Sequence, residues 1–148
     1  MSTDPNTFLE LYKEELIYAR HHELMRSQVT NIVLFSATAI TAAIGFDQKF
    51  SEADVPAGLL LFLLGIFGSL FSFKHFERFH FHYSRAREYR DTLDKELNLN
   101  LEEKRNRADK NVRNKFPRAH KWSLRYFWSG LPLISALLGI MIVVAAYY

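Results

Sequence analysis

Three long runs without a charged side chain constrain this sequence most. They cover residues 29–46, 55–73 and 126–148. A helix needs about 20 mostly apolar residues to cross the roughly 30 Å hydrocarbon core of a bilayer, and all three runs are near that length. A water-soluble chain of 148 residues would have too few other apolar residues to cover three such helices. The sequence therefore predicts an all-α membrane protein with three transmembrane helices, the third at residues 126–146.

The rest of the chain is highly charged and connects these runs. Its length suits a single domain, with connecting segments at residues 5–28, 47–54, 74–97 and 98–125. The chain contains no cysteine, which excludes disulfides, thiol nucleophiles and thiolate metal sites. The charged N-terminal segment has no apolar stretch of signal-peptide length, so we expect the first helix to remain in the mature protein.

The distribution of Lys and Arg predicts the topology. Fifteen of the 19 basic residues lie in residues 74–125, whereas the 47–54 loop holds one Lys and three acidic residues. The positive-inside rule then places the N-terminus and residues 74–125 in the cytoplasm, and the 47–54 loop and the C-terminus outside. Tyr and Trp residues near both ends of the third run match the aromatic belts of membrane interfaces.

Helices are expected to continue beyond the first two runs into the cytoplasm. Residues 5–28 contain no Gly or Pro after Pro5, and apolar residues recur at a 3-4 spacing through 74–97. The first two helices would then form a long helical hairpin. The partner of the second helix is either the N-terminal helix or the same helix of a neighbouring subunit. The predicted packing positions are Phe76, Phe79, Tyr83, Ala86, Leu93 and Leu97, interrupted by Arg90.

Small and weakly polar residues inside the runs are candidates for helix contacts. Asn31, Thr38 and Thr41 share one face of the first run, and Gly65 and Ser69 form a small-xxx-small pair in the second. These five residues either pack within one subunit or line a pore or a subunit interface. No run contains Asp, Glu, Lys or Arg, so nothing indicates a proton relay, a voltage sensor or a coupled transporter.

Four histidines form a second candidate group. His75 and His82 lie two helical turns apart after the second run, and His21 and His22 lie at a comparable depth before the first. With no Asp or Glu expected to form a triad with them and no close i, i+4 pair in the 74–90 stretch, we predict neither a metal site nor a cofactor. Their ordinary pKa range makes them natural pH-sensitive groups.

The basic cytoplasmic residues form a third candidate group. They would bind anionic lipid headgroups, RNA, a nucleotide or a partner protein. Arg113 precedes His120 with the loose spacing of HEPN-type ribonucleases, but Pro117 interrupts the helix that such a site needs, so we predict no enzyme and no catalytic residue. The candidate binding residues are Arg78, Arg85, Arg105, Arg107, Arg113, Arg118 and His120.

The order of these parts resembles a known kind of membrane protein. The stretch "ELIYARHHELMRSQ", the short outer loop and the exit "KHFERFHFHYSRAREYRDTLDKEL" are similar to the small bacterial SLATT-type two-helix membrane proteins. They also resemble the RipA-like family of octameric membrane proteins, which includes the membrane accessory of some RNA-targeting CRISPR systems. The third run departs from the two-span SLATT plan. The resemblance covers roughly residues 8–97.

The resemblance implies a homo-oligomer in the bacterial inner membrane, in contact with lipids and with copies of itself. It would be a pore-forming or membrane-perturbing effector of antiviral (anti-phage) defence, and its cytoplasmic part would sense a nucleotide or a partner protein. The alternative from the residues alone is a non-conducting membrane scaffold. Its basic segment at residues 98–125 would bind a partner protein, RNA or anionic lipid.

Overall fold

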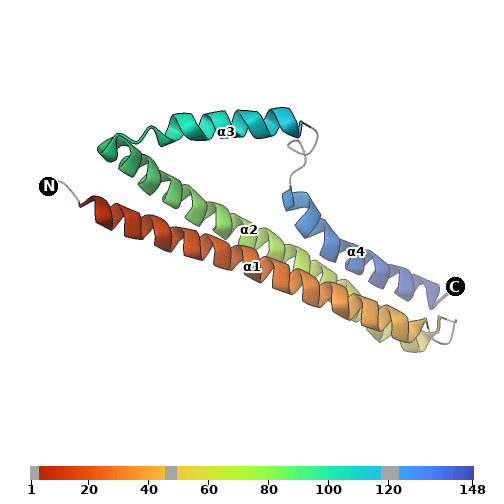
Figure 1. The fold of residues 1–148 in the computed structure, drawn as a ribbon. Helices are drawn as coiled ribbons and strands as arrows, with labels where there is room; N and C mark the ends of the chain where they lie inside the picture. The colour runs from red at the N-terminus through yellow and green to blue at the C-terminus, as the bar shows by residue number, and fades with distance from the viewer. Residues whose placement is uncertain (1–3, 46–49, 118–123) are drawn as a thin grey trace. The chain divides into compact units, whose positions relative to one another are not determined.

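The computed structural model describes residues 4–45, 50–117 and 124–148 and consists of helices (Figure 1). Four are α-helices, namely α1 (Pro5–Ile44), α2 (Val55–Leu97), α3 (Leu101–Lys115) and α4 (Leu124–Ala145), and the short 3-10 helix η1 (Glu52–Asp54) precedes α2. Helix makes up 91% of the structure and the described residues contain no strand, so the all-α prediction is confirmed. Within α1, α2 and α4 the structure contains apolar segments long enough to cross a membrane.

Local chemistry explains where the helices begin and end. The Asp4 carboxylate accepts a hydrogen bond from the Asn6 amide at 3.0 Å, and Pro5 occupies the first position of α1, where its missing N–H costs nothing. Before α2, the Ser51 amide and hydroxyl both donate to Asp54, at 2.9 and 3.1 Å. Helix α2 ends at Leu97 because Asn98 takes a left-handed backbone conformation, with φ at 51°.

The chain divides into two compact units, each of which includes part of α1 and part of α2. The first unit takes the described residues of Met1–His22 and Glu77–Ser123. The second takes those of Glu23–Phe76 and Leu124–Tyr148. Each unit is described by itself below.

In the first unit, the start of α1 packs against the end of α2. Phe8 contacts Tyr89, with ring centroids 6.4 Å apart, and Glu15 contacts His82, so the two helices run antiparallel here (Figure 1). Ala19, Ala86 and Leu93 are buried between or beside them. The N-terminal helix is therefore the partner that α2 takes within the chain.

The packing positions of α2 differ from the predicted ones at Tyr83 and Leu97, whose side chains are 40% and 49% exposed. The neighbouring His82 takes the place of Tyr83 in the contact with α1. The 3-4 spacing still holds, through Phe79, His82, Ala86 and Leu93. A histidine can take a position in the helix contact because it hydrogen-bonds to the buried Glu15 carboxylate.

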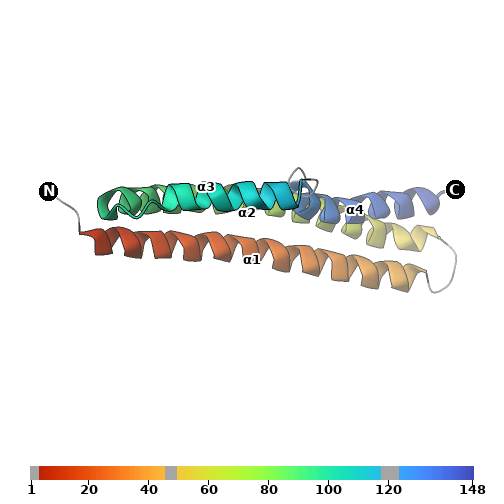
Figure 2. The same cartoon turned by 45° about the horizontal axis from the view of Figure 1, so that its top comes forward.

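In the second unit, α4 lies beside the first part of α2, as both views show (Figures 1 and 2). Glycines bring these helices together, since a Cβ at Gly58 would lie 2.9 Å from the Gly139 carbonyl oxygen. A Cβ at Gly65 would lie 2.6 Å from the Pro132 carbonyl oxygen. Both distances are too short for a real side chain. Helix α1 completes the unit, and its residue Ala37 shares a small core with Leu61 of α2 and others.

Large apolar side chains cover the outside of this second unit. Phe35 of α1 is 77% exposed, Leu70 of α2 66% and Met141 of α4 65%. Water-soluble domains rarely expose apolar surface so continuously, and a hydrocarbon environment would stabilise it. The buried residues, in contrast, include the hydroxyl side chains Thr30, Ser72 and Ser135.

Candidate functional sites

The Asn31, Thr38 and Thr41 side chains lie on α1 in the second unit and all three are exposed. The Thr38 hydroxyl donates to the Leu34 carbonyl of its own helix at 2.9 Å. The side-chain amide of Asn31 makes no hydrogen bond with any residue that the structure describes. Its N–H donors and its carbonyl acceptor are therefore available to another group, on an otherwise apolar segment.

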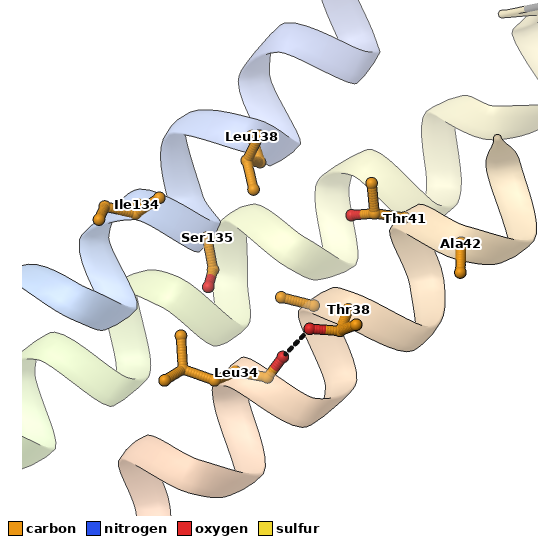
Figure 3. A pocket seen from close by; sticks show the side chains of 8 residues that line it. Leu34, Thr38, Thr41, Ala42, Ile134, Ser135 and Leu138 are labelled. Atoms are coloured by element: carbon orange, nitrogen blue, oxygen red, sulfur yellow. Dashed lines mark hydrogen bonds between the residues drawn. The ribbon is translucent and has the colours of Figure 1, made fainter.

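A groove of about 450 Å³ separates α1 from α4 beside these residues (Figure 3). Thr38 and Thr41 line it on one side, and Ile134, Ser135 and Leu138 line it on the other. The groove walls are mainly apolar, with hydroxyl groups as their polar atoms. Two of the three polar candidates on α1 thus border a depression in the surface of this unit.

Gly65 and Ser69 contact α4 of the same chain. A side chain at Gly65 would meet the Pro132 and Ala136 backbone, and the Ser69 hydroxyl donates to the Ser129 carbonyl at 2.8 Å. The structure thus uses these two residues for packing inside one chain. The face of α2 that carries these small residues is thus already occupied by α4, whereas the polar face of α1 is exposed.

Two side chains contact the Glu15 carboxylate in the first unit. Glu15 Oε2 lies 2.6 Å from His82 Nδ1, and Glu15 Oε1 lies 3.1 Å from Arg85 Nη1. The Glu15 side chain is 9% exposed. A hydrogen bond to the Tyr89 hydroxyl and the nearby Glu15 carboxylate raise the pKa of Arg85. The α1–α2 contact brings Glu15 to His82, a pairing that the spacing of the histidines along the sequence did not predict.

The four predicted histidines divide between the two units. In the first unit, His22 stacks on His82, with centroids 5.3 Å apart, and its other neighbour His21 contacts it edge-on at 5.7 Å. In the second, His75 stacks on Phe71 at 4.0 Å. Among the described residues, no group of three His, Cys, Asp or Glu side chains is arranged to hold a metal ion.

The basic segment contains α3, which has no buried residue. Arg107 pairs with Glu103 along the helix, Arg113 is exposed near its end, and Arg105 is partly covered. Arg78, on α2, is exposed as well. Predicted residues Arg118 and His120 lie outside the residues that the structure describes.

Asp94 of α2 fixes the start of α3. Its two carboxylate oxygens accept hydrogen bonds from the Leu101 and Glu102 amides, at 2.8 and 3.1 Å. The hydrogen bond from Leu101 is the main reason that the pKa of Asp94 is lowered. A carboxylate from the preceding helix therefore supplies the N-terminal partner that Asn100, with a left-handed backbone, does not.

The sequence analysis missed Arg26, which the second unit buries. Its relative exposure is 8%, and its guanidinium carbon lies 5.8 Å from the centre of the Phe76 ring and 5.6 Å from that of Trp128. Among the residues that the structure describes, Arg26 pairs with Glu23, at 4.0 Å. The signal available in the sequence was its place as the last charged residue before the 29–46 run.

No protein-family model matches this chain, and neither a curated protein nor a solved structure matches it. The geometry of the two units is therefore the basis for the function proposed next.

Proposed function

We propose that this chain is a bacterial inner-membrane protein whose copies associate through the polar face of α1, and that the assembly forms a pore or perturbs the membrane. The N-terminus and α3 would face the cytoplasm. The observation that carries the proposal is the exposed Asn31 amide, which has no hydrogen-bond partner among the described residues and lies among exposed apolar side chains.

Asn31 is the third residue of the 29–46 run, so its side-chain amide lies near the edge of the hydrocarbon, where water partners are few. Asn side chains there can hydrogen-bond between transmembrane helices. The Asn31 of a second copy offers the same donor and acceptor, so the two amides can satisfy each other. Thr38 and Thr41 lie further along the same face and would allow close approach or line a polar path.

A role in anti-phage defence is part of this proposal through the architectural resemblance. A cytoplasmic signal would change how the helices pack and so alter permeability. Glu15, His82 and Arg85 hold α1 to α2 in the first unit, so this contact is the place where such a signal would act.

The test compares Asn31→Leu with Ala39→Leu in proteoliposomes. Both changes add a leucine to an exposed position of α1, but only the first removes the amide. We expect Asn31→Leu to reduce oligomer mass in native mass spectrometry and to reduce dye leakage, and Ala39→Leu to change neither. Equal mass and leakage for wild type and Asn31→Leu would contradict the proposal.

A second candidate is a non-conducting scaffold that presents α3. The absence of any buried residue along the 15 residues of α3 favours it, since most of its surface is open to a partner. Replacing Arg105, Arg107 and Arg113 together by Gln should then abolish RNA binding in a mobility-shift assay. The exposed Arg20, replaced by Gln, is the control. Leakage-competent oligomers that bind no RNA would exclude an RNA-binding scaffold.

A further inference from the structure

The side chain of Arg26 is buried without the partners that a buried guanidinium needs. An arginine side chain has five N–H donors. None of them makes a hydrogen bond with a residue that the structure describes, and the Glu23 oxygen, at 4.0 Å, lies beyond hydrogen-bond distance. Glu23 is itself well exposed, so water weakens this pair.

Two aromatic rings stabilise the charge of Arg26 but leave its donors unused. The Phe76 and Trp128 rings, from α2 and α4, lie within cation–π distance of the guanidinium carbon. Nε is fully enclosed and without a partner. The terminal nitrogens, one of which faces Glu23, are the remaining edge through which a ligand can reach the group.

The positions of Arg26 and its two aromatic neighbours along the sequence indicate which ligand the guanidinium binds. Arg26 precedes the uncharged 29–46 run by three residues, Phe76 follows the 55–73 run by three, and Trp128 is the third residue of the 126–148 run. All three therefore lie where an apolar segment begins or ends. In a membrane this is the level of the lipid phosphates, and phosphate oxygens match the planar fork of arginine.

We infer that Arg26 is a binding site for the phosphate of an anionic phospholipid headgroup, held in place by Phe76 and Trp128. The inference rests on the membrane insertion that the proposed function includes. It adds a specific lipid site, formed inside one chain, that does not depend on Asn31 or on the oligomer. A free phosphate ion has the same oxygen chemistry, so the test must separate the two sources.

The experiment measures lipid binding to the delipidated full chain by native mass spectrometry. Phosphatidylglycerol is titrated against wild type and Arg26→Gln, and inorganic phosphate is titrated in a parallel arm. We expect Arg26→Gln to weaken phosphatidylglycerol binding about fivefold, the effect of one basic residue at an anionic surface. Arg20→Gln, which removes an equal but exposed charge of α1, should leave binding unchanged.

Each outcome decides the inference. Equal losses for Arg26→Gln and Arg20→Gln would mean attraction by overall charge and would overturn it, as would binding of inorganic phosphate as tight as that of the lipid. Should Arg26→Gln fail to fold, Arg26→Lys keeps the charge and lacks the planar fork, and phosphatidylglycerol binding as tight as in wild type would overturn the site. Failure of the wild-type chain to float with liposomes would instead refute the proposed membrane insertion.

Discussion

The close approach of α2 and α4 can be tested with two glycines of the same helix. Gly139 and Gly130 both lie on α4, but their surroundings differ. A Cβ at Gly139 would lie 3.1 Å from the Leu61 Cβ and closer still to the Gly58 and Phe62 backbone, whereas a Cβ at Gly130 would meet nothing within 4 Å. Replacing each glycine by alanine therefore adds the same methyl group to a closed and to an open site.

The expected difference follows from two terms. Helix propensity favours alanine over glycine by about 1 kcal/mol, and this gain is common to both variants. Overpacking against a well-packed neighbour costs about 1–3 kcal/mol, and the cost falls on Gly139→Ala alone. The free energy of unfolding of Gly139→Ala should thus be about 1–3 kcal/mol below that of Gly130→Ala. Because the two changes are chemically identical, the difference isolates the contact between the helices.

The measurement is reversible unfolding of the detergent-solubilised protein by SDS titration, followed by circular dichroism. Retention of helix content in both variants is the condition for comparing them. Equal unfolding free energies for the two alanine variants would refute the reasoning, because they would show that α4 does not pack on α2 through its glycines.

Two further predictions concern the first unit. Glu15→Gln should lower the free energy of unfolding by about 1–3 kcal/mol in the same titration, less than for a fully buried pair because Arg85 is 46% exposed. As a control, replacing the exposed Glu14 by Gln should change the free energy of unfolding little. Equal effects of the two substitutions would contradict the pairing of Glu15 with His82. Because the pKa of Asp94 is lowered by folding, its stabilisation of α3 is complete above the ordinary value of 3.8 and is lost as the pH falls through the folded-state pKa. The protection factors of the α3 amides, which correct for the pH dependence of intrinsic exchange, should therefore fall below that value in wild type, and Asp94→Asn should remove most of this change.

The fold was predictable because the strongest signals in the sequence are long. Three uncharged runs of this length have few alternatives to helices, and the end of α2 at Leu97 follows from two asparagines that favour a left-handed backbone. The N-terminal helix as partner of α2 was one of two options that the 3-4 spacing allowed. Spacing gives the face of a helix and leaves open which chain supplies the other side.

The polar contacts were harder to predict because they depend on register. Choosing Tyr83 over His82 for the packing face assumes that aromatic residues are buried before polar ones, and that assumption failed because Glu15 faces His82. Arg26 was missed for a related reason. A charged residue at the edge of an apolar run is usually taken to be solvated, whereas two aromatic rings from distant segments enclose this one.

Small and polar residues recur along the buried face of α1. Glu15, Ala19, Arg26, Thr30 and Ala37 are buried at intervals of four or seven residues, together with the apolar Val33 and Ile44, so small and polar side chains form much of the buried face. In hydrocarbon, lipid tails compete with apolar contacts, and close packing with hydrogen bonds is what distinguishes helices from lipid. Since the buried face already uses this chemistry inside the chain, the exposed Asn31 is the residue of α1 that can use it between chains.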